Sequence, residues 1–128
     1  MRTDSRVFAF KYIFADLFKS SLDGEENLSI LQEDNPLNDK DLTFSQEIIN
    51  SYNQNKQEIQ SLVEKALQGY QIERVFKADL ALIYTAVAEY KFMQTPKPIV
   101  VNETLEISKK YSTEKSSSFI NGVIAKVD

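Results

Sequence analysis

A run of apolar residues between positions 73 and 93 constrains the fold of this chain more than any other feature of its sequence. The apolar side chains recur at spacings of four and three residues, at Phe76, Leu80, Ile83, Val87 and Tyr90. At 3.6 residues per turn, this spacing places them in one stripe along an α-helix. The sequence therefore predicts a buried helix over residues 73–93. It ends before Thr95-Pro96, because a residue that precedes proline avoids the helical conformation.

A first helix is expected over about residues 4–20, and it has two apolar faces. One face carries Phe10, Ile13, Phe14 and Leu17. The roughly opposite face carries Phe8, Tyr12 and Ala15. A helix that is apolar on two sides is buried on both or keeps one side for a partner. We expect a central helix that packs between two subdomains.

The rest of the chain also has helical periodicity. Residues 21–40 predict a short helix between two loops, capped by Asn27 or by the acidic residues before it. The apolar pattern over residues 39–68 predicts a long helical segment. The polar stretch 53–57 interrupts it, and Gly69 is expected to end it. Two further helices are expected over 99–111 and about 114–127. With only three glycines and three prolines, the sequence indicates a compact all-α fold of about seven helices.

The residue types that are missing exclude most enzymes. The chain has no cysteine and no histidine, so it lacks thiol nucleophiles and the most common general base and metal ligand. Glu103 and Glu106 can share one helix face, but no third ligand accompanies them. No glycine-rich phosphate loop is present. We therefore expect no enzymatic activity, no metal and no cofactor.

The sequence also lacks the signals of membrane insertion and secretion. No run of about 18 apolar residues is present, so no transmembrane helix and no membrane partner are expected. Charged residues interrupt the first twenty positions, which therefore lack the apolar core of a signal peptide. These observations favour a cytoplasmic protein.

The net charge of −4 is unevenly distributed. Residues 1–19 carry four basic and two acidic groups, residues 20–47 carry one basic and eight acidic groups, and residues 48–128 carry ten basic and nine acidic groups. Arg2, Arg6 and Lys11 are interleaved with Phe8 and Tyr12, a combination that suits phosphate binding and base stacking. Three cations in eleven residues are also ordinary for a helix end, so composition alone does not assign an RNA site.

The C-terminal stretch Ile99 to Val127, IVVNETLEISKKYSTEKSSSFINGVIAKV, carries the most specific pattern. It resembles the C-terminal signature of the NusB family of transcription antitermination factors. The matching positions, in order, are Pro96, Asn102, Glu103, Lys109, Tyr111, Glu114, Phe119, Asn121 and Gly122. Because glycine inside a helix costs about 1 kcal/mol relative to alanine, we expect Gly122 to allow the close approach of another helix.

Weaker matches extend the resemblance over the whole chain. Ala81-Leu82-Ile83, Ala86 and Glu89 resemble the family's central helix, and Arg6, Ala9, Ile13 and Phe14 resemble its N-terminal pattern. The resemblance implies a single domain, residues 1–128, made of two small helical subdomains. The N-terminal one spans about 1–68 and the C-terminal one about 69–128.

The resemblance also implies a function. A protein of this family binds a boxA-like single-stranded RNA together with a small ribosomal protein, NusE. Within the transcription elongation complex it supports antitermination and the synthesis of ribosomal RNA. The RNA contacts that it implies here are Arg2, Arg6, Phe14, Asp79, Lys115 and Ser118, with Lys11 and Tyr12 as outer candidates.

Several positions depart from the family pattern. Thr3 and Asp4 interrupt the basic N-terminal segment, Ser118 stands where lysine is common, and Phe14 lacks the hydroxyl of the usual tyrosine. Lys115 restores one positive charge, because this position is often acidic. Fewer phosphate contacts imply weaker RNA binding and a flatter salt dependence than in a typical member.

Three alternatives stay open at this point. The chain could be a helical protein–protein interaction module that has the NusB fold and weak or no RNA affinity, which the acidic span 20–47 favours. It could also be a shortened relative of the NusB-like domain of some RNA methyltransferases. A homodimer would form if the second apolar face of the first helix were exposed.

Overall fold

The fold is all-α, as expected. The computed structural model describes residues 2–18 and 23–128, and within them seven α-helices and one short 3-10 helix form, without any strand. The elements are α1 (Arg2–Leu17), α2 (Gly24–Asp34), α3 (Asp39–Gln54), α4 (Lys56–Leu67), η1 (Ile72–Arg74), α5 (Lys77–Phe92), α6 (Lys97–Tyr111) and α7 (Ser116–Lys126). The predicted end of the first helix, at residue 20, lies outside the described residues.

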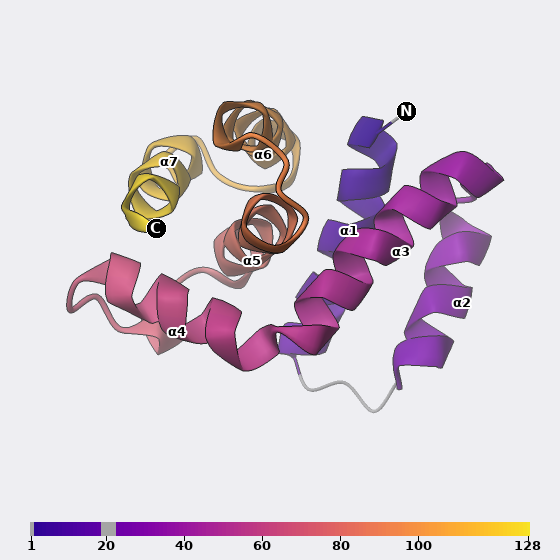
Figure 1. The fold of residues 1–128 in the computed structure, drawn as a ribbon, viewed down its shortest axis with the longest axis horizontal. Coiled ribbons are helices and arrows are strands. Elements are labelled where there is room, and N and C mark those ends of the chain that lie inside the picture. Colours follow the sequence, from indigo (N-terminus) through magenta and orange to yellow (C-terminus); the bar gives the residue numbers. More distant parts are fainter. Residues whose placement is uncertain (1, 19–22) are drawn as a thin grey trace.

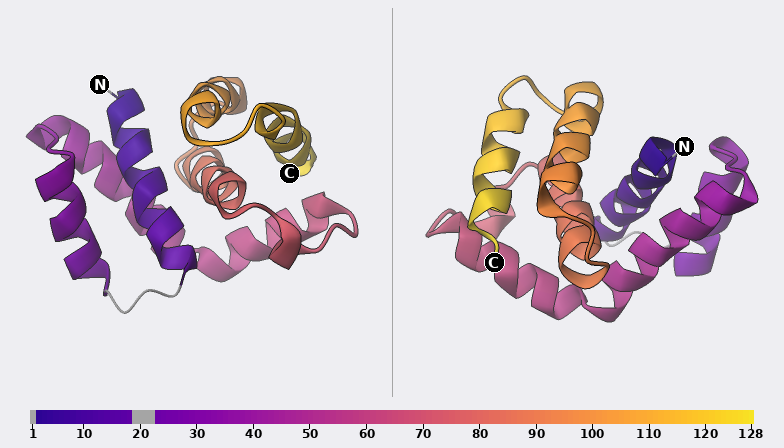
Figure 2. Two further views of the ribbon diagram at one scale, coloured as in Figure 1. Left: turned by 180° about the vertical axis from the view of Figure 1, so that it is seen from behind. Right: turned by 45° about the horizontal axis from the view of Figure 1, so that its top comes forward.

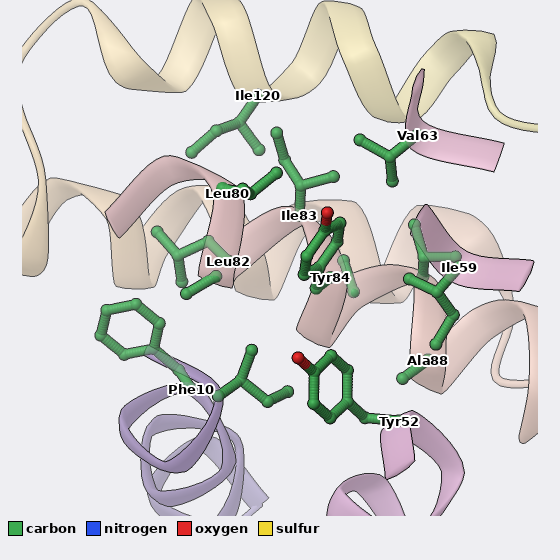
Figure 3. Packing of buried hydrophobic residues seen from close by; sticks show 14 of the residues in the cluster. Phe10, Tyr52, Ile59, Val63, Leu80, Leu82, Ile83, Tyr84, Ala88 and Ile120 are labelled. Carbon is green, nitrogen blue, oxygen red and sulfur yellow. The ribbon is translucent and has the colours of Figure 1, made fainter. Parts of the chain in front are cut away.

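Helix α5 is the centre of the molecule. It contacts α1, α3, α4, α6 and α7, and 12 of its 16 residues are buried. In Figure 1, α1, α2 and α3 lie on one side of it and α6 and α7 on the other. Side chains from α1, α3, α4 and α7, including Phe10, Tyr52, Ile59 and Ile120, point toward α5 (Figure 3). The predicted buried helix is therefore confirmed, and the other helices pack around it.

The predicted start of this helix and the burial of Phe76 were wrong. The chain between residues 72 and 74 forms η1, and α5 begins only at Lys77. Phe76 has an extended backbone, with φ −57° and ψ 129°, and precedes the first helical residue. Its side chain is 58% exposed. The apolar spacing therefore continues beyond the helix that it predicts, into a residue that faces solvent.

Helix α1 is buried on two sides, as its two apolar faces predict. It contacts α2 and α3 as well as α5, and Phe8, Phe10, Tyr12 and Ile13 are all buried. Helix α2 lies on the outer edge, with α1 between it and α5 (Figure 2, left). The second apolar face of α1 is thus covered by this chain's own helices.

The predicted helix boundaries follow local chemistry. The side chain of Asp23 accepts a hydrogen bond from the backbone N–H of Glu26 at 2.8 Å, so an acidic residue caps α2. The polar stretch 53–57 does break the long helical segment, because Asn55 separates α3 from α4. Gln68 and Gly69 end α4 with φ values of 51° and 92°. Glycine tolerates this left-handed conformation because it has no Cβ.

Helix α4 packs against α5 and α7, whereas α3 packs against α1 and α5. The division of the chain near residue 68 stays a prediction. The contacts of α4 favour a boundary close to Asn55, where the helix axis changes direction (Figure 2).

The expected close approach of another helix at Gly122 is absent. A Cβ atom built at this position meets no atom within 4 Å. The resemblance identified a glycine at this position, but packing in this structure does not require it.

We predict that Gly122→Ala stabilises the protein by up to about 1 kcal/mol, because alanine has the higher helix propensity and open space receives its methyl group. Urea unfolding measures the gain. Gly24→Ala is the control, since a Cβ there would lie 2.8 Å from the Tyr12 hydroxyl oxygen and should bring no gain. A loss of stability in Gly122→Ala would contradict the packing described.

Two buried phenols predict the response to alkaline pH. Burial raises the pKa of Tyr52 and of Tyr84 far above the ordinary tyrosine value, and the hydrogen bond from Tyr52 to Asp16 adds to the shift. Folding therefore favours the neutral phenols. The unfolding free energy should stay constant below about pH 10 and fall by about 1.4 kcal/mol per pH unit per phenol above it. Urea unfolding of Tyr52→Phe and Tyr84→Phe between pH 8 and 11 should give shallower slopes, and unchanged slopes would refute the assignment.

Candidate nucleic-acid interface

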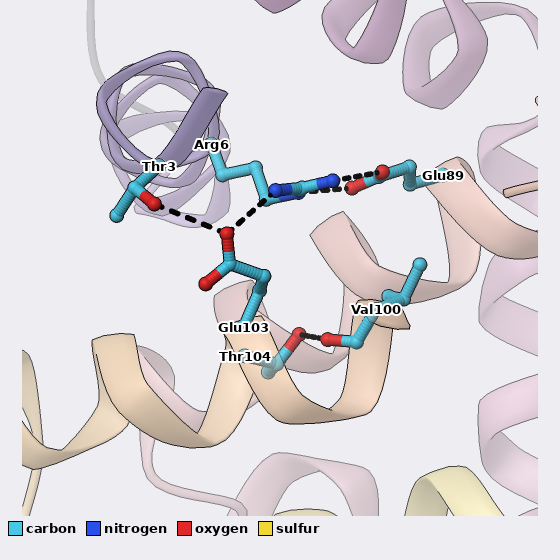
Figure 4. A network of polar contacts seen from close by, with 6 residues as sticks. All are labelled: Thr3, Arg6, Glu89, Val100, Glu103 and Thr104. Carbon is cyan, nitrogen blue, oxygen red and sulfur yellow. Dashed lines mark hydrogen bonds and ion pairs between the residues drawn. The ribbon is translucent and has the colours of Figure 1, made fainter. Parts of the chain in front are cut away.

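Arg6 forms a buried ion pair with Glu89. The Arg6 Nε and Nη2 atoms donate to the two carboxylate oxygens of Glu89 at 2.7 Å each, and both side chains are almost fully buried. The Arg6 Nη1 atom donates to Glu103 Oε1 at 2.8 Å, and the Thr3 hydroxyl donates to the same oxygen at 3.0 Å. Figure 4 shows this network joining α1 to α5 and α6.

These hydrogen bonds hold the guanidinium group of Arg6 inside the protein. Hydrogen bonding to Glu89 raises the pKa of Arg6 further above its usual value, against the opposing effect of burial. The side chain is only 5% exposed. Arg6, predicted as an RNA contact, therefore lies where it holds three helices together and presents almost no surface to a ligand.

Tyr12 also lies inside the protein. It is 5% exposed, and its hydroxyl accepts a hydrogen bond from Asn53 Nδ2 at 3.2 Å. Its backbone carbonyl accepts from Asn27 Nδ2 at 3.2 Å, which ties α2 to α1. The residue belongs to the buried face of α1 toward α2 and α3.

Arg2 and Lys11 remain at the surface. The Arg2 guanidinium lies 4.4 Å from the centroid of the Phe44 ring, a cation–π contact that leaves the residue exposed. Lys11 donates to Asn35 Oδ1 at 2.9 Å, and its ammonium lies 5.5 Å from the ring centroid of Tyr111. Lys110 approaches the same ring at 5.4 Å. These two lysines line a groove of about 460 Å³ between α1 and α6.

Four aromatic rings form a row from this groove along α1. Tyr111 contacts Phe10 at a centroid distance of 5.6 Å, Phe10 contacts Phe14 at 6.0 Å, and Phe14 contacts Phe18 at 4.8 Å. Phe14 is half-buried and Phe18 is 56% exposed. We call Phe10, Phe14, Phe18 and Tyr111 the aromatic row. Its exposed end offers ring surface for stacking on an unpaired base.

The remaining predicted residues lie where α5 begins, α6 ends and α7 begins. Asp79 is 6% exposed and accepts a hydrogen bond from the Ser112 hydroxyl, whose oxygen is also 2.8 Å from that of Ser116. Lys115 and Ser118 are exposed at the start of α7. Because Ser112 directly follows Tyr111, this cluster and the aromatic row meet at the C-terminal end of α6.

The predicted residues therefore separate into three groups. Lys11, Phe14, Asp79, Lys115 and Ser118 belong to the region around the end of α6, and Arg2 lies about 18 Å from Phe14 along α1, at 1.5 Å per residue. Arg6 and Tyr12 lie in the interior. The sequence alone did not indicate five further surface residues of this region: Phe18, Lys110, Tyr70, Arg74 and Phe76. Phe18 and Phe76 are apolar residues just beyond a helix end, which is the signal that could have found them.

Within residues 2–18 and 23–128, no group of three or more acidic side chains is arranged to hold a metal ion. In the same residues, no helix has both the length and the apolar character that crossing a membrane requires.

Comparison with known families identifies relatives along almost the whole chain. The profile of the NusB family matches residues 3–128. The transcription antitermination protein NusB of Clostridium botulinum (strain Loch Maree / Type A3) is 37% identical over 127 residues, which cover 87% of this chain and 90% of that protein. The NusB protein of Acetivibrio thermocellus is 34% identical and covers 98% of this chain and 87% of its own.

Solved structures share the fold. NusB of T. maritima superimposes with a TM-score of 0.89 at 25% identity, over 99% of this chain and 89% of that one. A chain from the crystal structure of the antitermination factors NusB and NusE in complex with double-stranded RNA superimposes with a TM-score of 0.88. It is 25% identical and covers 98% of this chain and 94% of its own.

The buried ion pair predicts a large loss of stability when one partner is changed. Glu89→Gln should lower the unfolding free energy by about 3–5 kcal/mol, because it removes the fully buried counter-charge of Arg6 and leaves only the more exposed Glu103. Glu103→Gln is the matched control. Its side chain is 28% exposed, so the loss should be near 1 kcal/mol. Chemical unfolding measures both, and equal losses would contradict a dominant Arg6–Glu89 pair.

Proposed function

This chain belongs to the NusB family of transcription antitermination proteins, and we propose that it binds a boxA-like single-stranded RNA together with a small ribosomal protein of the NusE type. The family is not enzymatic. The relative from the complex of NusB and NusE with double-stranded RNA supports a role with RNA and a NusE-type partner, because the fold is shared over 98% of the length of this chain. In this role the protein acts in the cytoplasm, as part of the transcription elongation complex.

The observation that carries the proposal is the aromatic row beside surface cations. Lys11 and Lys110 flank Tyr111 at one end of the row, and Phe18 is exposed at the other. Phosphate groups bind lysine side chains, and unpaired bases stack on exposed rings. This combination favours a single strand, because the bases of a duplex are not available for stacking on a side chain.

The proposed RNA surface differs from the one that the family pattern implies. Lys11, Phe14, Asp79, Lys115 and Ser118 stay in it, and Arg2 contributes a cation at the far end of α1. Arg6 and Tyr12 are left out, because both are nearly fully buried. Their contribution is to fix the position of α1, from which the aromatic row projects.

With few free cations, the RNA affinity of the chain alone is expected to be modest. For single-stranded RNA, each phosphate contact contributes about 0.7 to the slope of the logarithm of the binding constant against the logarithm of the salt concentration. A ribosomal protein that binds both the RNA and this chain raises the effective concentration of the RNA near the chain's own RNA surface. We therefore propose that RNA binding depends strongly on the protein partner.

A second candidate function is a protein–protein interaction module without RNA binding. The outer face of α2 supports it, because its exposed acidic residues give a surface that repels RNA and suits a basic protein. These residues are Asp23, Glu25, Glu26, Glu33 and Asp34. The RNA titration below distinguishes the two candidates.

We predict that the double variant Lys11→Gln with Lys115→Gln binds single-stranded RNA more weakly and with a flatter salt dependence. Losing two phosphate contacts should reduce the slope of log affinity against log salt by about 1.4. Fluorescence anisotropy with a labelled boxA-like RNA, with and without the ribosomal protein, measures the slope between 50 and 200 mM salt.

The matched control is Lys65→Gln with Lys91→Gln, which removes two exposed lysines of α4 and α5 and should leave the slope unchanged. Equal slopes for both double variants would exclude Lys11 and Lys115 from the site. If the unsubstituted protein failed to bind RNA even with the ribosomal protein, the interaction module would replace the RNA-binding function.

A further inference from the structure

A pocket of about 330 Å³ lies where the end of α1 meets the break between α3 and α4, beside η1 and the first turns of α5. Its apolar and aromatic lining consists of Leu17, Tyr52, Ile72, Leu80 and Tyr84. We call it the junction pocket. A concave lining of this kind, with a few polar groups among apolar ones, is typical of sites that hold a small organic group.

Tyr84 places a hydroxyl group without a partner at this pocket. The residue is only 5% exposed, and its hydroxyl forms no hydrogen bond with any described residue. Every fully buried side-chain oxygen in the described part of the chain does have a hydrogen-bond partner. The Tyr84 oxygen is therefore not fully enclosed, and because the side chain lines the junction pocket, a group in the pocket can reach it.

The neighbouring Tyr52 differs from Tyr84 because its hydroxyl is used inside the protein. The two rings lie 6.1 Å apart (Figure 3), and the Tyr52 hydroxyl donates to Asp16 at 2.8 Å. Packing does not account for the Tyr84 hydroxyl, since phenylalanine would fill the same space without burying a polar group. Burial raises the pKa of Tyr84, so the phenol keeps its proton. It is available to an acceptor from outside the chain.

The charges around the junction pocket balance. Lys56 donates to Asp16 at 3.0 Å, which pairs one charge of each sign. Glu73 and Lys77 also line the pocket, and neither forms an ion pair with any described residue. RNA gains little from a pocket without net positive charge. A neutral group suits it better, flanked by one charge of each sign.

The junction pocket and the proposed RNA surface use different faces of the same helices. At 3.6 residues per turn, a residue two positions away lies on nearly the opposite side of a helix. On α1, Asp16 is two positions from Phe14, and on α5, Lys77 is two positions from Asp79. The two surfaces can therefore be occupied at the same time.

We infer that the junction pocket is a docking site for a peptide segment of a partner protein. An apolar side chain of that segment packs against the apolar lining, and an amide carbonyl accepts a hydrogen bond from the Tyr84 hydroxyl. Peptide amides fit because they are neutral and carry an acceptor on an apolar skeleton. Charged residues beside the apolar one pair with Glu73 and Lys77. Protein interfaces combine an apolar anchor in a pocket with a polar rim in this way, and the inference does not depend on RNA binding.

Titration with a blocked amino acid tests the site. N-acetyl-leucinamide carries one apolar side chain and neutral amides. In protein with isotope-labelled tyrosine, the NMR signal of Tyr84 is identified by its absence from Tyr84→Phe. This signal should shift saturably, with a Kd in the millimolar range that suits a ligand of this size. The anion N-acetyl-leucine and the cation leucinamide should bind more weakly. No shift with N-acetyl-leucinamide, or equal binding of all three compounds, would overturn the inference.

Removal of the hydroxyl tests the hydrogen bond. Tyr84→Phe keeps the ring and should weaken N-acetyl-leucinamide binding by roughly 2- to 12-fold, the range for one neutral hydrogen bond, as followed at the Tyr52 signal. The matched control is Tyr90→Phe, which removes a hydroxyl of the same helix that donates to the Val127 carbonyl outside the pocket. It should leave binding unchanged. Equal affinities of the two variants would exclude Tyr84 as the donor.

Stability separates a binding role of this hydroxyl from a structural one. At neutral pH, Tyr84→Phe should leave the unfolding free energy unchanged or raise it, because no partner within the described chain is lost. Tyr52→Phe should lower it, because Asp16 loses a donor. Equal losses in urea unfolding would show that the Tyr84 hydroxyl serves the fold, and the inference would fail.

Short peptides distinguish a protein segment from a small amide as the occupant. A blocked lysine-leucine-glutamate tripeptide and its reverse sequence place one charge of each sign beside the leucine. The order that matches Glu73 and Lys77 should bind about 2- to 30-fold more tightly than blocked serine-leucine-serine, the range for two exposed ion pairs. Glu73→Gln with Lys77→Gln should abolish this gain. The control, Glu58→Gln with Lys65→Gln, changes two exposed residues of α4 outside the pocket and should keep it. Without a gain for either order, the pocket holds a small amide only and the docking site is excluded.

Discussion

The ion pair between Arg6 and Glu89 determines how the first helix packs on the central helix, α5. It joins α1 to the last turn of α5, and Glu103 and Thr3 extend it to α6. Two charges leave water to form it, and their attraction offsets that desolvation only when the geometry is close to ideal. The two parallel hydrogen bonds at 2.7 Å meet this condition. The pair also fixes the rotation of α1 about its axis, and with it the direction in which the aromatic row faces.

Much of the fold is predictable from the sequence, because helical spacing, polar breaks and caps are local properties. The break at Asn55 and the capping of α2 by Asp23 both follow from residues within a few positions. The burial of Arg6 and of Tyr12 does not follow from nearby residues. Each looks like a surface residue of a basic, aromatic helix, and each is buried by partners that stand far away in the sequence, such as Glu89 and Asn53. Periodicity shows which face of a helix is apolar, but not which charges have a buried partner.

The same limit applies to the candidate site. Phe14, Asp79 and Lys115 come from three separate parts of the sequence, and only the resemblance to the NusB family related them to one another. The structure adds Tyr111 and Ser112, consecutive residues that link the aromatic row to the cluster around Asp79. Phe76 was assigned to the core because it continues the apolar spacing of α5. Its exposure depends on where the helix starts, and boundaries are the least certain part of a prediction from sequence.

The central position of α5 has a consequence for the order of events during synthesis of the protein. Helix α1 is made first, yet its main partners in the fold are α3 and α5. The face of α1 that packs on α5 therefore stays uncovered until the ribosome has released residues up to about Phe92. A nascent polypeptide with such a stretch is exposed to aggregation and to chaperone binding for that interval. The late synthesis of Glu89 also means that Arg6 gains its buried partner only when α5 is made.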